Sequence, residues 1–284
     1  MEVIRAEALG LCFGVRDALA ATETVPDPHD VTIYGELVHN EHVNRRLVQL
    51  GFRQVGERER QTEAPATGRV LITAHGVSNT ERARLREAGR ELIDTTCPLV
   101  SRAHEAALRL DAEGRFVVVI GRRGHVEVRG LTGDLRNYAV VESPGEARPY
   151  AAEKIGVIAQ TTSTDALVSA VLDAVRAMNP GRPVRYVDTV CRPTRERQQA
   201  LRALLPRVDV LIVVGGRNSR NTNELVEAAR ARGVPAFRVA GASELVPAWF
   251  IGCRAAGLTA GTSTLDEAIE EVHRTLLAMQ TLAA

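Results

Sequence analysis

The sequence predicts an α/β fold made of three small α/β domains with mostly parallel sheets. Short runs rich in β-branched residues alternate with amphipathic helical patterns from end to end, which is typical of βαβ units. Three of the four cysteines are separated by 85 and then 94 residues, close to the length of one small domain each. Each of these three lies where a strand passes into a helix, in GLCFGV, DTTCPLV and DTVCRPT. Three α/β units around a central site would bring these three cysteines together.

The individual elements follow from the spacing of apolar residues. The β-branched runs predict strands at 31–34, 69–73, 116–120, 155–159, 184–187, 210–214 and 236–239. The amphipathic patterns predict helices at 44–51, 79–88, 100–112, 165–178, 195–205, 222–232 and 265–279. The expected domains are 1–97, 98–190 and 191–284. Residues 56–68 are polar and charged, and are interpreted as a surface loop or a segment at a boundary.

Composition limits the classes of partner. The chain has 284 residues, 45% of them hydrophobic, and a net charge of +1. A nearly balanced charge gives no reason to expect a nucleic acid or an anionic membrane as partner. The first residues lack the basic and then apolar layout of a signal peptide, and no apolar run approaches the length that spans a bilayer. A soluble cytoplasmic protein is expected.

The spacing of the cysteines does not indicate structural disulfides or a zinc knuckle. In a reducing compartment two structural disulfides are not expected, and CxxC spacing is absent from the sequence. Taken singly, a cysteine is more often a buried apolar residue than a ligand. Cys253 stands outside the repeated spacing and is interpreted as structural.

Polar side chains follow the expected strands at their carboxyl ends, where open α/β sheets bind ligands. They are His39 and Asn40, His75, His125 and Glu127, Thr161 and Thr162, Asn218, Ser219 and Asn221, and Thr262 and Ser263. Taken alone, each has an ordinary explanation as a helix cap or a hydrogen-bonded structural residue. Together with helix N-termini and the Gly215-Gly216 turn, they are typical of a phosphate site.

With these motifs, the sequence resembles the LytB family of 4-hydroxy-3-methylbut-2-enyl diphosphate reductases. The matching stretches cover nearly the whole chain: GLCFGV, GELVHN, AHGVS, DTTCPLVSRAH, GHVEV, QTTS, DTVC with TRERQ, GGRNSRNTNEL and AGTS. Nine ordered motifs at compatible spacing are a specific signal.

The resemblance implies three α/β domains around a pseudo-threefold centre, which enclose a [4Fe–4S] cluster and a small allylic diphosphate. It implies cluster ligands Cys12, Cys97 and Cys191, and diphosphate contacts from His39, His75, His125, Ser219, Asn221 and Ser263. Thr162, Asn218 and Arg220 are further candidates for substrate binding. Three cysteines leave one iron without a protein ligand. The resemblance also implies a monomer in isoprenoid biosynthesis that receives electrons from a ferredoxin or flavodoxin.

Glu127 and Thr161 are the expected catalytic pair beside the reacting hydroxyl. Because Glu127 follows His125 by two residues, both are expected to face the same side of an extended segment. Glu127 is then the proton donor. The alternative is a surface glutamate, or one paired with Arg122, Arg123 or Arg129.

Several residues depart from the family pattern. Val126 replaces a usual proline, Arg220 replaces a small hydroxyl residue, Pro193 replaces an alanine, Arg122 and Arg123 lie close to His125, and Arg16 is shifted. These departures leave the substrate open. Three alternatives are considered. They are a paralogue that performs the same reduction on another substrate, a zinc hydrolase with three cysteine ligands, and a non-catalytic binding or electron-transfer module.

Overall fold

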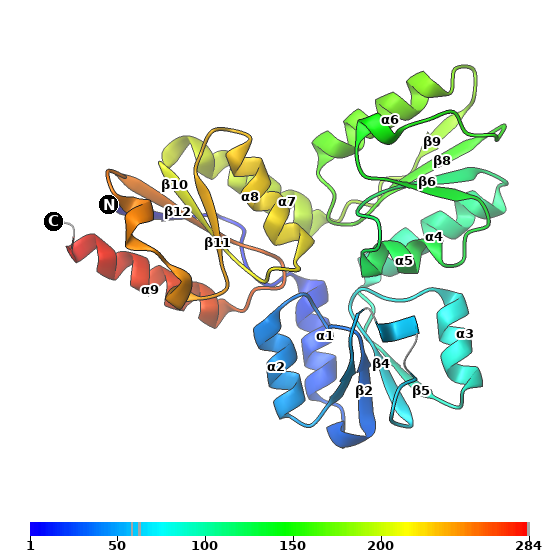
Figure 1. The fold of residues 1–284 in the computed structure, drawn as a ribbon, viewed down its shortest axis with the longest axis horizontal. Coiled ribbons are helices and arrows are strands. Elements are labelled where there is room, and N and C mark those ends of the chain that lie inside the picture. The colour runs from blue at the N-terminus through cyan, green and yellow to red at the C-terminus, as the bar shows by residue number, and fades with distance from the viewer. Residues whose placement is uncertain (58, 62–63, 283–284) are drawn as a thin grey trace. The chain divides into compact units, whose positions relative to one another are not determined.

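A computed structural model describes residues 1–57, 59–61 and 64–282 of the chain, and within them the strands form three parallel four-stranded sheets (Figure 1). Sheet A has the order β1 (Glu2–Arg5), β12 (Ala255–Ala260), β10 (Val210–Val214) and β11 (Ala236–Val239). Sheet B has the order β3 (Arg53–Val55), β2 (Val31–Tyr34), β4 (Arg69–Ile72) and β5 (Glu91–Asp94). Sheet C has the order β7 (Tyr138–Val141), β6 (Phe116–Ile120), β8 (Ile155–Ala159) and β9 (Val184–Tyr186). The prediction of three small α/β units with parallel sheets is confirmed.

Helices connect the strands. They are α1 (Phe13–Glu23), α2 (Glu41–Gln49), α3 (Asn79–Glu87), α4 (Pro98–Ala112), α5 (Val126–Thr132), α6 (Asp165–Met178), α7 (Arg192–Leu204), α8 (Arg220–Arg230) and α9 (Asp266–Leu282). A short 3-10 helix, η2 (Glu59–Gln61), lies in the segment that the sequence analysis interpreted as a loop or boundary. In the described part of the chain, no helix combines the length and the apolar character needed to cross a membrane.

The chain divides into two compact units. The first unit contains Met1–Val15, His39–His42 and the chain from Arg192, and so holds all of sheet A. The second unit contains Arg16–Val38 and Val43–Cys191, and so holds sheets B and C. Strand β1 pairs with β12, so sheet A combines the N-terminal residues with residues 210–260. The expected domain limits 1–97, 98–190 and 191–284 stay a prediction.

In sheet A, alternate residues of the central strand β10 face opposite layers of helices. Leu211 and Val213 pack in the cluster formed by α7 and α8, and Ile212 and Val214 pack in the cluster formed by α9. All four side chains are fully buried. A strand that is buried on both faces reads as a continuous apolar run, which is why VLIVV predicts this strand so clearly.

Sheet C is covered in the same way. Val117 and Val119 of β6 pack with α4 and α5, and Val118 and Ile120 pack with α6. Figure 1 shows α6 on one side of the sheet and α4 and α5 on the other. Buried parallel strands place their carboxyl ends along one edge, and the loops that leave this edge carry the candidate site residues.

The seven strands expected from the sequence are all present, with bounds that differ by at most one residue. The strands β1, β3, β5, β7 and β12 were not among the seven. Strand β12 is central in sheet A, and its sequence AAGLTA has only one β-branched residue. The other four each lie at the edge of a sheet. An edge strand is covered on fewer sides, so it tolerates charged and polar residues such as those in Arg53–Val55. The apolar signal of these strands is correspondingly weak.

Candidate active site

Each of the three regularly spaced cysteines immediately precedes a helix. Cys12 precedes α1, Cys97 is the N-cap residue of α4, and Cys191 precedes α7. All three are partly exposed, and no described cysteine forms a disulfide. The positive end of a helix dipole and its unpaired N–H groups stabilise a thiolate, the form that binds metal.

The three cysteines also share one backbone contact. Each donates its N–H to the carbonyl oxygen of a residue in a loop that follows a central strand of a sheet. The pairs are Cys12 to Thr262 (3.0 Å), Cys97 to Ala74 (3.1 Å) and Cys191 to Thr161 (2.9 Å). These acceptor loops follow β12, β4 and β8, and they carry Ser263, His75 and Thr161. The backbone of each predicted metal ligand therefore binds a loop that carries a predicted substrate-binding or catalytic residue.

The cysteines are divided between the units. Cys12 belongs to the first unit, and Cys97 and Cys191 belong to the second. Among the described residues, no group of three His, Cys, Asp or Glu side chains is arranged to hold a metal ion.

In the first unit, polar residues gather where α8 begins. Ser219 is the N-cap of α8 and accepts the Thr222 N–H at 3.3 Å. Asn221 Oδ1 accepts the N–H of Thr262 at 3.0 Å, which joins α8 to the loop after β12. Asn221 is 2% exposed, and its Nδ2 is buried without a hydrogen-bond partner in the described residues. A buried donor without a partner is costly, and an anionic ligand is one way to satisfy it.

The His39 segment lies against the same loops. A Cβ atom on Gly216 would lie 2.6 Å from the carbonyl oxygen of His39, so only glycine allows this approach. Asn40 Nδ2 donates to the Ser263 carbonyl at 2.7 Å, and Ser263 Oγ donates to the His39 carbonyl at 3.4 Å. The first unit thus brings His39, Ser219, Asn221 and Ser263 to neighbouring loops.

Two other predicted residues of this unit differ from that group. Asn218 is exposed. Arg220 forms an ion pair with Glu224 one turn along α8. Burial raises the pKa of the Glu224 carboxyl, and the Arg220 charge opposes that shift. The Arg220 guanidinium therefore has a carboxylate partner on its own helix.

In the second unit, Glu127 is buried and held by the loop after β8. Its side chain is 3% exposed, and Oε1 accepts the backbone N–H of Thr161 at 2.7 Å. Thr161 is also buried, at 4% exposed, and its carbonyl binds Cys191. The interpretation of Glu127 as a surface glutamate is wrong. Arg129 is ion-paired with Glu57, and Arg123 with Glu142 and Glu146.

Two histidines of the second unit, both predicted to bind the diphosphate, lie close together. The rings of His75 and His125 meet edge to face, with centroids 6.0 Å apart. His75 and Glu127 line the same cavity, of about 190 Å³. Thr162, beside Thr161, has a buried Oγ1 without a hydrogen-bond partner among the described residues. The structure therefore brings the predicted acid close to two predicted diphosphate ligands.

The expected extended segment through His125 and Glu127 is wrong. His125 is the N-cap of α5, and its Nδ1 accepts the Glu127 N–H at 3.1 Å. Val126 and Val128 are two residues apart, as apolar residues are on one face of a strand. Both lie in helix α5, however, and both are buried there. The helix is favoured over a strand because Val128 and Leu131 then lie on one face and pack together against α4.

The fourth cysteine has a different environment. The Cys253 thiol donates to the Trp249 carbonyl oxygen at 3.6 Å. Burial, and then the Asp209 carboxylate, raise the pKa of this thiol, so it stays neutral. Cys253 also lies outside the repeated arrangement of cysteines that precede helices.

Several residues that shape the site have only a weak signal in the sequence. Gln160 Oε1 accepts the Arg122 N–H at 3.1 Å and so links the loop after β8 to the loop after β6. Glu57 and Arg60 lie in the segment taken for a loop or boundary, yet Arg60 is 4% exposed. The sequence signal was weak, because an arginine in a charged stretch is normally solvated.

Comparison with known proteins identifies the family. A sequence model described as LytB protein matches residues 3–277. A 4-hydroxy-3-methylbut-2-enyl diphosphate reductase of Aquifex aeolicus is 34% identical over 282 residues, with 96% of this chain and 94% of that protein covered. The protein of the same name from Anaeromyxobacter sp. (strain K) is 36% identical, with 99% of this chain and 100% of that protein covered.

Solved structures agree. A structure of (E)-4-hydroxy-3-methyl-but-2-enyl diphosphate reductase, described as the terminal enzyme of the non-mevalonate pathway, is 32% identical, with a TM-score of 0.65. The match covers 98% of this chain and 100% of that chain. The Plasmodium falciparum E-1-hydroxy-2-methyl-but-2-enyl-4-diphosphate reductase has the same fold, with a TM-score of 0.86, 24% identity, and coverage of 97% of this chain and 87% of that chain. The chain belongs to the LytB protein family.

Proposed function

We propose that this chain reduces (E)-4-hydroxy-3-methylbut-2-enyl diphosphate to isopentenyl and dimethylallyl diphosphate in non-mevalonate isoprenoid biosynthesis. In this reaction the substrate gains two electrons and two protons and loses its hydroxyl as water. The observation that carries the proposal is the contact between Glu127 and Thr161, because it joins a buried acid to the loop that binds the Cys191 backbone. The named relatives support the choice of substrate.

The donor set fits an iron–sulfur cluster. Cys12, Cys97 and Cys191 would hold a [4Fe–4S] cluster, since thiolates are its usual ligands and all three cysteines lie at helix N-termini. The neutral, hydrogen-bonded Cys253 does not fit this role. When bound, the cluster supplies the electrons one at a time.

Glu127 would act as the general acid. A carboxylic acid near the allylic hydroxyl donates the proton that lets the oxygen leave as water. The Thr161 N–H binds Oε1 and so orients the carboxyl that would carry the proton. Burial of both residues keeps bulk water away from the reacting carbon.

Two groups of residues would hold the diphosphate. His39, Ser219, Asn221 and Ser263 lie on neighbouring loops of the first unit, and His75 and His125 lie together in the second. Thr162, Asn218 and Arg220 are further candidates, of which Arg220 shares its charge with Glu224. Imidazole, hydroxyl and amide donors at helix N-termini are suited to phosphate oxygens.

Two of the departures from the family pattern are accommodated by local contacts. Val126 is buried at the start of α5, and Arg123 forms ion pairs with Glu142 and Glu146. These contacts give Val126 and Arg123 structural roles, so neither residue favours a paralogue that acts on another substrate. Our proposal includes the domains 1–97, 98–190 and 191–284, a cytoplasmic monomer, and a ferredoxin or flavodoxin donor.

Anaerobic purification tests the proposal against the zinc alternative. The expected result is a brown protein with about four irons, which converts the allylic diphosphate to its two products with a reduced ferredoxin. A colourless protein that holds zinc would contradict the cluster. A brown protein that reduces another allylic substrate and leaves this one unchanged would contradict the choice of substrate.

A further inference from the structure

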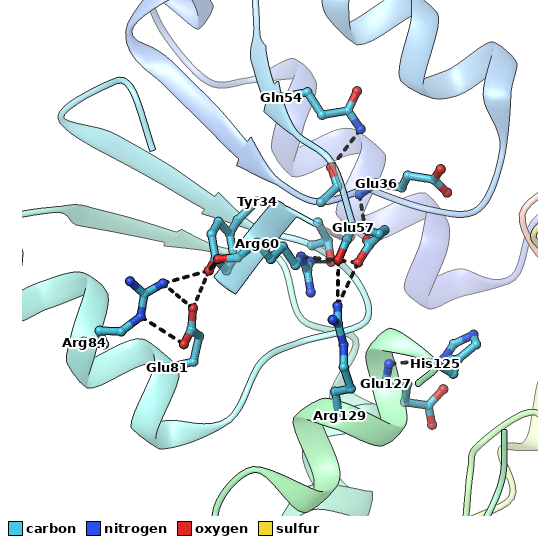
Figure 2. Close-up of polar contacts among 12 residues, drawn as sticks. Tyr34, Glu36, Gln54, Glu57, Arg60, Glu81, Arg84, His125, Glu127 and Arg129 are labelled. Carbon is cyan, nitrogen blue, oxygen red and sulfur yellow. Dashed lines mark hydrogen bonds and ion pairs between the residues drawn. The ribbon is translucent and has the colours of Figure 1, made fainter. Parts of the chain in front are cut away.

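Three segments that lead to predicted site residues are linked through the ion pair of Glu57 and Arg60. The first is the loop after β2, which continues to His39. Glu57 Oε1 accepts the N–H of Glu36 at 2.8 Å, and Gln54 Nε2 donates to the carbonyl oxygen of Gly35 at 2.8 Å (Figure 2). Gly35 has φ +108°, and a Cβ atom there would lie 2.4 Å from Glu57 Oε1. Glycine is therefore required for this close approach.

The second segment is the loop after β4, which carries His75. Arg60 reaches it through a hydrogen bond from its guanidinium to Thr73 Oγ1, at 3.1 Å. The same guanidinium lies over the ring of Tyr34, 5.1 Å from its centroid, and pairs with Glu57 at 3.4 Å. Arg60 is 4% exposed, so its position is fixed by protein contacts rather than by solvent.

The third segment is α5, which begins after His125 and carries Glu127. Arg129 extends from this helix toward Glu57, where its guanidinium donates to the main-chain carbonyl at 2.9 Å and lies 3.5 Å from the carboxylate (Figure 2). Among the described residues, this contact links the helix of the predicted acid to the segment between β3 and β4.

We propose that Glu57, Arg60 and Arg129 form a positioning hub that sets the placement of α5, and with it His125 and Glu127, relative to the loop of His75. The proposal rests on the proposed function, because that function assigns roles to Glu127 and His125. Each of the three contacts ends within four residues of a predicted site residue. A buried ion pair is weak support for stability alone, since desolvation offsets much of its attraction.

The test is Arg129→Gln, with Arg123→Gln as matched control. Arg123 lies just before α5 and forms exposed ion pairs with Glu142 and Glu146, so its loss removes a comparable charge without touching the hub. Displacing a reacting group by about 1 Å costs about a hundredfold in rate. We expect kcat of Arg129→Gln to fall by roughly tenfold to a hundredfold, with partial recovery in Arg129→Lys and no loss in the control. An equal loss in Arg123→Gln, or no loss in Arg129→Gln, would overturn the proposal.

A double-mutant cycle separates positioning from general stability. If Arg129 acts largely through Glu127, then Arg129→Gln should cost less activity in a Glu127→Gln enzyme than in the wild type, because only the displacement of His125 then remains. A further loss of the full size would show that Arg129 acts independently of the acid, and would overturn the proposal.

Hydrogen exchange keeps the two proposals distinguishable. Arg129→Gln should raise the exchange of the amides in Val126–Thr132 at least tenfold, whatever Glu127 does in the reaction. Normal turnover in a Glu127→Gln enzyme would show that Glu127 is not the acid. The exchange measurement would still decide whether the hub holds α5 in place. Unchanged exchange in Arg129→Gln and Arg129→Lys would overturn the hub, even where the acid is confirmed.

Discussion

Thr161 donates its backbone N–H to Oε1 of Glu127 at 2.7 Å, and this contact places a buried carboxyl at the carboxyl end of sheet C. The two residues come from different strand–helix connections, the first after β8 and the second after β6. Because the donor is a main-chain group, the orientation of the carboxyl is fixed by the fold.

This contact makes Glu127→Gln a clean test of the proton donor. The amide oxygen of glutamine can still accept the Thr161 N–H, so the side chain keeps its place while the acid is lost. We expect turnover to fall by roughly 10²–10⁴-fold. Pyrophosphate binding, measured by calorimetry, should change little. Glu142→Gln, at an exposed ion pair, is the control. Near wild-type turnover in Glu127→Gln would show that the proton comes from elsewhere, for example from the substrate diphosphate.

The cysteines differ enough in environment for metal content alone to test their roles. Cys12→Ser, Cys97→Ser and Cys191→Ser should each lose iron, because serine is a poor ligand for the cluster. Cys253→Ser should retain iron, because its thiol is neutral and hydrogen-bonded to Trp249. Iron per chain and the visible spectrum after anaerobic purification are the measurements. Full iron in the Cys191 variant would rule out the ligand set.

Much of the site could be predicted because the sequence signals were local. The strand-end residues His39, His75 and Thr161 follow apolar runs that are buried on both faces, and such runs are easy to recognise. The cysteines stand out by their spacing and their position before helices. These signals depend on the periodicity of nearby residues, which the sequence displays directly.

The features that could not be predicted depend on tertiary contacts. The helix α5 was missed because Val126 and Val128 alternate as in a strand, and only packing against α4 selects the helix. Arg60 was read as part of a loop, since nothing in a charged stretch shows that Tyr34 and Thr73 will bury it. Partners distant in the sequence leave no local pattern, so such residues are visible only in the structure.

The buried amide of Asn221 gives a prediction about the diphosphate. Asn221→Asp keeps the size of the side chain and the acceptor for Thr262, but it replaces a buried donor with a negative charge. Loss of a hydrogen bond to a charged ligand costs about 1.5–3 kcal/mol. Pyrophosphate affinity should therefore fall by roughly tenfold to a hundredfold, as measured by calorimetry.

Asn223→Asp is the matched control for this change. Asn223 lies on the same helix and donates to the Arg217 carbonyl oxygen at 3.0 Å, so its substitution adds the same charge nearby. We expect a much smaller effect there. Equal losses in both variants would mean that the added charge, and not the Asn221 donor, weakens binding.

Tyr34 gives a prediction about alkaline stability. Burial, and then a hydrogen bond and the charge of Glu81, raise the pKa of the Tyr34 phenol to about 12. In the unfolded chain a tyrosine titrates near pH 10, as an approximate reference value. Because the folded pKa is the higher one, the stabilisation is fully present below about pH 10 and is lost as the pH rises toward about 12. Its size is at most about 2.7 kcal/mol, at about 1.36 kcal/mol per pKa unit.

Urea unfolding between pH 9 and pH 12 measures this effect. The free energy of unfolding of the wild type should fall more steeply with pH than that of Tyr34→Phe, because the phenylalanine has no proton to lose. Tyr138→Phe controls for the loss of a hydroxyl, since Tyr138 is 43% exposed on β7 and lies outside the hub. Parallel curves for the wild type and Tyr34→Phe would show that the phenol ionises as easily in the folded protein as in the unfolded chain. That result would also mean that the contacts with Glu81 and Arg60 leave water access to Tyr34.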